Sequence, residues 1–315
     1  MKTVHEQRAS TILHNVLRSN ASDGRWMLPA NVCPIVPLTF LKAGVAFEFV
    51  DINAETLCVH ERAVVTRLRD DPARYAGILF VHTYGREQTV EPLFAALRAE
   101  ASGALLVDDR CPCDPCFEAT ENGADVVLYS SGYGKPVDVG AGGYAFLGDR
   151  VVYESRSLPY VEQDLARLTG SYKSDIAARL RIADAPGDWL DTSPPETDFD
   201  AYRATIEQAR ATARAHREEI RSIYRERLPD SIFVPAGDWR VHLRVPDRDR
   251  LIASIFDAEL FASTHYASLA GIFSAGGEAP VANALHADVI NLFDDRRFTP
   301  EQAHRACDVI LRHLG

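Results

Sequence analysis

A lysine in a glycine-rich loop is the residue of this sequence best suited to covalent chemistry. Lys135 stands in SSGYGKPVDVGAGG (130–143), which continues the apolar stretch ADVVLYSS (124–131). Glycines let backbone approach a ligand closely, and the hydroxyls of Ser130 and Ser131 suit a phosphate. A lysine held among apolar walls becomes a nucleophile toward carbonyl carbons. Taken alone, a solvated lysine in a turn is the commoner interpretation of such a loop.

Two adjacent carboxylates end the preceding apolar run. Asp108 and Asp109 close GALLVDD (103–109), where a turn-forming role is the ordinary one for aspartate. The strand ends of a parallel sheet meet at one edge, so these carboxylates should lie in the same cleft as Lys135. Three kinds of group hold pyridoxal 5'-phosphate: a carboxylate binds its pyridine nitrogen, an amine binds its aldehyde and hydroxyls bind its phosphate. The combination predicts a site for that cofactor.

The first half of the chain supplies the elements that would position these residues. Helical spacing with charged faces marks 55–71 and 86–101. Apolar runs typical of strands buried on both faces occur at 25–30, 45–52, 76–84, 103–109, 124–131 and 142–149. This alternation predicts an α/β fold of three layers (αβα), in which helices cover both faces of a mostly parallel central sheet.

The second half has a different pattern. The stretch 185–198, rich in Pro and Asp, is predicted to be a boundary loop, and 199–223 carries the apolar stripe of a long helix that Thr197 or Asp198 can cap. Beyond it the sequence predicts two strands, a helix and a last helix with a capping box, at 231–235, 239–245, 247–258 and from Thr299. We expect a large domain over residues 1–185, and a connecting helix with a smaller C-terminal α+β domain over 186–315.

Composition excludes several classes of protein. The 315 residues are 46% hydrophobic and 25% charged, as in an ordinary globular protein. A net charge of -11 argues against nucleic acid or an anionic membrane as the partner. No apolar run reaches the roughly 18 residues of a membrane span, and the first ten residues lack the apolar segment of a secretory signal. Six cysteines are too few for a secreted disulfide framework, so we expect a soluble cytoplasmic protein.

The sequence resembles the sugar aminotransferases of the DegT/DnrJ/StrS family, which are fold-type I pyridoxal phosphate enzymes. The blocks that carry the resemblance are PANVCPIVPLTFLKAGVAFEFVDI, FVHTYG, VDDRCP, SSGYGKPVDVGAGG, STHYASL and VINLFDDRRFTPEQAHRACDVI. The lysine block keeps every spacing of the family's S-F-x-x-x-K-x-x-x-x-G-x-G-G motif. The resemblance covers about residues 9–152 and 200–315, and it implies the fold-type I architecture.

The resemblance implies a role for individual residues toward the cofactor. Lys135 would form the Schiff base and later shuttle a proton, and Asp109 would pair with the pyridine nitrogen. Cys33 stands where the family often has an aromatic residue that stacks on the ring. Contacts with the phosphate are implied for Ser130 and, at the start of the first helix, for Ser10 and Thr11.

Other positions are implied to face the substrates. His82 and His265 fall where the family places such residues, although a hydrogen-bonded loop histidine is an equally good interpretation. Arg240 and Arg244 flank a strand of the small domain, where fold-type I enzymes often bind the donor's carboxylate, and we select Arg244. The motif C-x-C-x-x-C at 111–116 has no fourth ligand nearby, so no metal site is predicted.

The resemblance implies an aminotransferase that works as a homodimer. It would move an amino group from an amino acid, glutamate first, to a keto group of a nucleotide-linked sugar or small phosphorylated carbonyl compound. The sequence departs from the family in having Pro112 for a Gln, Cys33 for an aromatic residue, no G-Y-N-x-R-M segment in 166–198 and only a short stretch before the first matched helix. Two alternatives stay open: a weakened relative that binds cofactor or sugar for regulation or assembly, and a decarboxylase or lyase on the same cofactor.

Overall fold

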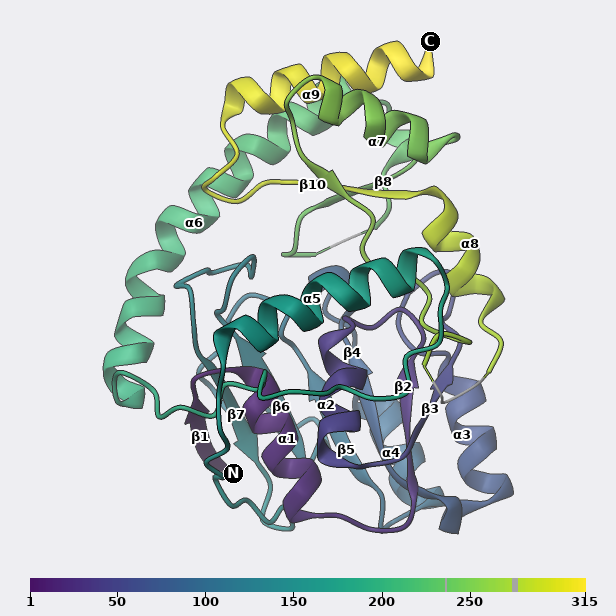
Figure 1. Cartoon of the computed structure of the whole chain (residues 1–315), viewed down its shortest axis with the longest axis vertical. Coiled ribbons are helices and arrows are strands. Elements are labelled where there is room, and N and C mark those ends of the chain that lie inside the picture. Colours follow the sequence, from purple (N-terminus) through teal and green to yellow (C-terminus); the bar gives the residue numbers. More distant parts are fainter. Residues whose placement is uncertain (236, 274–276) are drawn as a thin grey trace.

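A seven-stranded sheet forms the larger part of the protein (Figure 1). The structure is a computed structural model, and it describes residues 1–235, 237–273 and 277–315. The strand order is β1-β7-β6-β5-β4-β2-β3, parallel from β3 to β6, with β7 antiparallel to both β6 and β1. The strands are β1 (Lys2–Glu6), β2 (Arg25–Pro29), β3 (Phe47–Val50), β4 (Tyr75–Val81), β5 (Leu105–Asp109), β6 (Val126–Ser130) and β7 (Gly143–Leu147).

Helices cover both faces of this sheet. Ile78 and Leu79 are consecutive in β4 yet belong to different cores, because successive side chains of a strand point to opposite faces. Both faces must therefore be apolar, which accounts for the uninterrupted apolar runs. The helices on one face are α1 (Ala9–Ser19) and α2 (Ile35–Ala43), and those on the other are α3 (Glu61–Asp70), α4 (Glu91–Glu100) and the start of α6 (Phe199–Arg227). The predicted αβα arrangement is confirmed.

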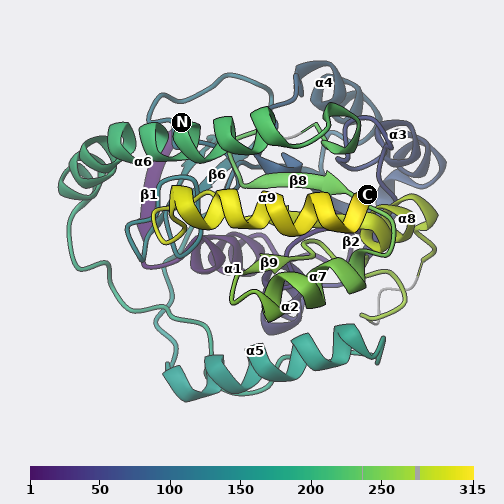
Figure 2. The same cartoon turned by 90° about the horizontal axis from the view of Figure 1, so that it is seen from above.

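A smaller antiparallel sheet, in the order β8-β10-β9, makes a second core with α7, α9 and the end of α6. Its elements are β8 (Val241–Arg244), α7 (Arg248–Asp257), β9 (Ala262–Ser263), β10 (Val289–Leu292) and α9 (Pro300–Leu314). The helix α6 starts beside the large sheet and ends alongside α9, so it joins the two parts (Figures 1 and 2). Among the described residues, no helix is both long and apolar enough to pass through a membrane.

The predicted helix caps are confirmed at both ends of this region. The carboxylate of Asp198 accepts a hydrogen bond from the N–H of Ala201 (2.9 Å) at the start of α6. At the start of α9, Thr299 and Gln302 form the reciprocal capping box, with side chain to backbone distances of 3.2 and 2.9 Å. Each cap satisfies N–H groups that a helix leaves without partners.

Several elements differ from the expectation. Residues 231–235 form a 3-10 turn (Asp230–Ile232) and an isolated bridge instead of a strand. The periodicity of the sequence does not predict the edge strand β1, the helix α5 (Glu162–Ala177), the helix α8 (Pro280–Asp288) or the strands β9 and β10. A single side chain of α5, Leu168, is buried, and the helix lies apart from the others in Figure 2. An element with so little buried surface leaves little apolar periodicity in its sequence.

The two cores do not separate at residue 185. Trp189 and Leu190 belong to the core of the large sheet. The chain also returns to that core after β9, with Tyr266, Leu269 and then Leu285 of α8 (Pro280–Asp288), before β10 completes the small sheet. This return brings Tyr266 to the carboxyl edge of the large sheet.

A buried arginine of α6 ties the two parts together. The Arg217 guanidinium pairs with Asp294 (2.5 Å) and donates to the carbonyl of Asp238 (3.2 Å), both in the small part. It also donates to the carbonyls of Pro136 and Lys135 (3.1 Å each) in the large part. Buried carbonyls and a buried carboxylate are costly without donors, so this side chain determines how the two parts meet.

Replacing Arg217 should therefore destabilise the fold strongly. Arg217→Met leaves the fully buried Asp294 with one cation, Arg221 at 2.7 Å, and should lower the free energy of unfolding by about 3 to 5 kcal/mol. Urea denaturation followed by circular dichroism measures the loss. The control is Arg203→Met on the same helix, whose exposed pair with Glu207 is screened by solvent and should contribute little to stability. Equal losses in the two variants would refute the proposed importance of the buried network.

Aromatic rings fill the junction between the two parts. The rings of Tyr84, Trp239 and Tyr266 are nearly parallel, with centroids 5.4 to 6.2 Å apart. The ring of His242 lies 3.7 Å from that of Tyr84, and neither of its nitrogens has a hydrogen-bond partner among the described residues. Burial lowers the pKa of His242 well below its ordinary value, and the charge of Arg240 lowers it further. The imidazole is therefore neutral at neutral pH.

A buried neutral imidazole makes folding sensitive to acid. The unfolded chain takes up a proton on His242 below about pH 6.5, whereas the folded protein does not, so the stability contributed above that pH is lost as the pH falls. His242→Phe keeps the packing and removes this proton, so its unfolding free energy should fall less steeply, by at most about 1.4 kcal/mol per pH unit. Denaturation curves from pH 7 to pH 5 measure both slopes, and parallel slopes would contradict the prediction.

Candidate functional site

A cavity of about 280 Å³ lies at the carboxyl ends of β5 and β6. The parallel sheet brings Asp109, the last residue of β5, and Ser130, the last residue of β6, to this common edge. Among the residues predicted from the sequence, those that line the cavity are Ser10, Cys33, Asp109, Ser130 and Lys135. Segments far apart in the sequence therefore meet where the strand-end argument placed them.

The loop that carries Lys135 is held by hydrogen bonds on several sides. The carboxylate of Asp138 accepts from the N–H groups of Gly134 (2.8 Å) and Gly140 (2.9 Å). The indole N–H of Trp239 donates to the carbonyl of Gly134 (2.7 Å), next to the Lys135 carbonyl that Arg217 binds. Because its backbone is fixed from both domains, the loop presents the Lys135 side chain to the cavity in one position.

The two adjacent aspartates have opposite surroundings. Asp108 accepts hydrogen bonds of 2.7 Å from each of His82, Arg110 and Asn122. Burial alone would raise the pKa of Asp108, but the His82 hydrogen bond and the Arg110 charge hold it below the ordinary value. Asp109 instead faces the cavity, and burial raises its pKa. The hydrogen bond from the N–H of Cys111 (2.9 Å) and the charge of Lys135 lower this pKa, but by less than burial raises it. Successive strand residues point to opposite faces, so only Asp109 is available to a ligand.

The serine hydroxyl groups of the cavity lining come from two segments. Ser130 is 8% exposed, and its Oγ accepts a long hydrogen bond from the Gly132 N–H (3.4 Å). Ser10 lies in the first turn of α1 and lines the cavity. Thr11 does not, because its hydroxyl donates to the carbonyl of Asp191 (2.6 Å). Consecutive helix residues point about 100° apart, so only one of the predicted pair can face the cavity.

None of the three residues expected to face the substrates, His82, His265 and Arg244, is part of the cavity lining. His82 is fully buried, with Nε2 on Asp108 and Nδ1 accepting from the N–H of Gln88 (3.0 Å). It matches the alternative interpretation of a hydrogen-bonded loop histidine. Arg244 is exposed at the end of β8, away from the lysine loop. For His82 and Arg244, the sequence pattern indicates the position along the chain but not the direction of the side chain.

Arg240 is the cation of the small part that reaches the lysine loop. Its guanidinium lies 3.9 Å from the point that a Cβ on Gly134 would occupy, stacks on Trp239 (4.4 Å) and donates to Ser263 Oγ (2.6 Å). No carboxylate of the described residues pairs with it. The adjacent His265 is neutral, since burial and the nearby cations lower its pKa to about 3. A cation without a carboxylate beside a reactive lysine is suited to bind an anionic group.

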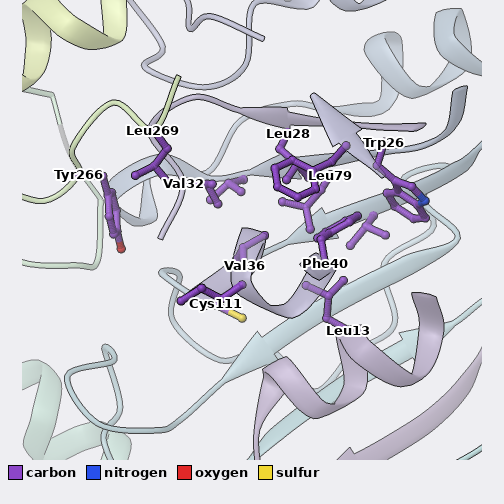
Figure 3. Close-up of a cluster of buried hydrophobic side chains, with 14 of the residues drawn as sticks. Leu13, Trp26, Leu28, Val32, Val36, Phe40, Leu79, Cys111, Tyr266 and Leu269 are labelled. Carbon is purple, nitrogen blue, oxygen red and sulfur yellow. The ribbon is translucent and has the colours of Figure 1, made fainter. Parts of the chain in front are cut away.

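The rest of the lining is largely apolar. Val32, Val36, Cys111 and Tyr266 belong to the cluster drawn in Figure 3, which continues beneath the cavity. Burial raises the pKa of Cys33 and of Cys111, so both are thiols rather than reactive thiolates. Within the described ranges, no group of three or more His, Cys, Asp and Glu residues is arranged to hold a metal ion.

Two residues of the lining with ring or charged side chains, Tyr266 and Arg8, were not among the predicted site residues. Tyr266 is its buried aromatic ring, within the STHYASL block, and the return of the chain to the large core places it there. Arg8 lies directly before α1 and is, with Lys135, one of two cations in the lining. An arginine before a helix carries no recognisable signal, because serine, threonine and aspartate are the usual residues at that position. The cavity thus combines two cations, one carboxylate and the hydroxyls of two serines with apolar walls, a set able to hold an anionic aromatic ligand beside an amine.

Comparison with solved structures identifies the fold. The sugar aminotransferase CalS13 from Micromonospora echinospora superposes with a TM-score of 0.69 at 17% identity, covering 98% of this chain and 86% of that chain. DesI, solved in the presence of its TDP-sugar product, gives 0.72 at 16% identity, covering 100% and 84%. A DegT DnrJ EryC1 StrS aminotransferase from Brucella abortus gives 0.67 at 16%, covering 100% and 86%.

The likeness to these proteins is one of structure. No protein family model matches the sequence, and no curated protein sequence matches it. The agreement nevertheless extends over both sheets and the long helix that joins them, since nearly all of the chain is covered. The protein therefore has the α/β fold of the DegT/DnrJ/EryC1/StrS sugar aminotransferases, the architecture that its sequence blocks implied.

Proposed function

We propose that the protein is a pyridoxal 5'-phosphate-dependent aminotransferase that transfers an amino group to a keto group of a sugar. The observation that carries the proposal is the meeting of Lys135, Asp109 and Ser130 in one cavity with apolar walls. The donor set fits the cofactor, with an amine, a buried carboxylate and hydroxyls at separate places. When bound, the cofactor supplies an aldehyde that condenses with an amine and a ring that withdraws electrons from the substrate carbon.

The chain's own residues then have distinct tasks. Lys135 Nζ holds the cofactor and afterwards moves a proton at the substrate carbon, as a general base and acid. Asp109, which one backbone N–H already orients, accepts from the protonated ring nitrogen. Ser10 and Ser130 donate to the phosphate, and Cys33 and Tyr266 help to keep water from the ring. Buried walls strengthen each of these interactions.

Arg240 supports an amino acid as the donor. It is the cation beside the lysine loop that lacks a carboxylate among the described residues, so we assign it the donor's carboxylate in place of Arg244. His265, neutral and within 3.4 Å of Arg240, is retained as a substrate-facing residue that orients this group. We propose glutamate as that donor.

The acceptor is proposed from the comparisons. The similar structures are named sugar aminotransferases, and one was solved with a TDP-sugar product. We therefore propose a nucleotide-linked sugar. A homodimer, which the sequence resemblance implies, completes the proposal, together with a cytoplasmic location, which the low cysteine content favours.

The lysine is tested by absorption spectroscopy. Wild-type protein with pyridoxal phosphate should show the visible band of lysine-bound cofactor, and glutamate should convert it to the near-ultraviolet band of the amine form. Lys135→Ala should lose the visible band and about 10³-fold or more of the rate, because it removes both the covalent bond and the proton carrier. Lys2→Ala, in the exposed edge strand β1, is the control. A wild-type band that ignores glutamate would favour the alternative of a weakened relative.

The donor site is tested by steady-state kinetics. Arg240→Gln should raise KM for glutamate about 10- to 100-fold, the loss expected for a charge-assisted bond to a carboxylate, with a smaller effect on the sugar acceptor. Arg244→Gln, four residues further on and exposed at the end of β8, should leave KM for glutamate within about twofold. The reverse order of effects would restore Arg244 as the donor-binding residue.

A further inference from the structure

We propose that Arg8 supplies the positive charge that holds the cofactor's phosphate, within the same chain as Lys135. The inference rests on the proposed function and goes beyond it, because the sequence resemblance implied only hydroxyl and N–H groups at that end of the cavity. Arg8 precedes α1 and lines the cavity together with Ser10 and Gly132.

The contacts of Arg8 place its guanidinium between α1 and the glycine loop. Its Nη1 donates to the carbonyl of Gly140 (3.1 Å). It also lies 3.7 Å from the point that a Cβ on Gly132 would occupy. The Nε forms an ion pair with the carboxylate of Asp191 at 3.9 Å, a distance too long for a hydrogen bond. One of five N–H donors is therefore engaged within the described residues, and the others are available to a ligand.

The charges of the cavity require such a group. A phosphate monoester carries close to two negative charges at neutral pH, and burying them without a counter-charge is costly. The cations of the lining are Arg8 and Lys135, and the amine of Lys135 is assigned to the aldehyde at the other end of the cofactor. Ser10 and Ser130 offer neutral donors. Arg8 is thus the one full positive charge of the lining that remains for the phosphate.

The start of α1 is itself built for an anion. The residue before the helix has extended backbone angles (φ −144°, ψ 147°) but its side chain caps no N–H group, and the first turn contains no acidic residue. Helices normally fill this position with an oxygen acceptor. Here an arginine stands instead, beside Ser130, a serine more than nine-tenths buried that lines the same cavity. A bound phosphate would supply the missing acceptor oxygens and pair with the arginine at once.

Comparison of pyridoxal phosphate with pyridoxal tests the inference, since the two ligands differ only in the phosphate. Dissociation constants are measured by quenching of tryptophan fluorescence, for which Trp239 beside the lysine loop is well placed. For Arg8→Gln we expect the constant for pyridoxal phosphate to rise about 10- to 100-fold and that for pyridoxal to stay unchanged. Arg8→Lys should recover part of the loss. Arg62→Gln, on the exposed face of α3, controls for net charge.

Each other outcome overturns a defined part of the argument. Equal weakening of both ligands by Arg8→Gln would show that Arg8 supports the cavity and not the phosphate. No weakening of either ligand would exclude Arg8 from the site. In both cases a normal lysine-dependent band in wild-type protein leaves the aminotransferase proposal standing. Failure of wild-type protein to bind either ligand would reject both proposals, and the melting temperature of each apo variant shows whether the fold is intact.

Discussion

One buried guanidinium joins the lysine loop to the small domain. Arg217 binds the carbonyls of Lys135 and Pro136 on one side and Asp294 and the Asp238 carbonyl on the other. The lysine loop and the small domain are thus fastened to the same side chain, which is carried by the helix that connects them. A movement of the small domain would therefore also shift the backbone of Lys135. The same attachment sets the position of Arg240 relative to the cavity.

The second constraint comes from the parallel sheet, because successive residues of a strand point to opposite faces and so have different surroundings. Asp108 and Asp109 follow one another, yet Asp108 is hydrogen-bonded to His82 and Arg110 on one side of the strand and Asp109 faces the cavity on the other. Their pKa values are displaced in opposite directions, downward for Asp108 and upward for Asp109. The first carboxylate anchors the strand end at which the second is presented, so the pair has both a structural and a chemical role.

The sequence predicted what depends on local pattern, and missed what depends on direction. Buried strands, the caps of α6 and α9, and the meeting of Lys135 with Asp109 all follow from periodicity and strand order. Thr11 was assigned to the cavity although helical phase turns its hydroxyl to Asp191. Arg8 and Tyr266 were not predicted to line the cavity, because their neighbours in space come from distant parts of the chain. A site residue can be recognised in the sequence when its own helix or strand determines where its side chain points. It cannot be recognised when packing between distant segments determines this direction.

The glycine-rich loop shows how packing and chemistry share one motif. Its glycines were expected to let backbone approach a ligand, but a Cβ on Gly142 would lie 2.3 Å from the ring of Tyr202, and one on Gly143 2.4 Å from the backbone nitrogen of Ala9. These glycines therefore let α6 and the start of α1 close onto the strand beside the loop. A side chain at Gly143 would displace the first turn of α1, and with it Ser10 and Arg8, from the cavity. The glycine spacing after the lysine thus sets how closely the start of α1, with Ser10 and Arg8, approaches the strand that follows the lysine loop.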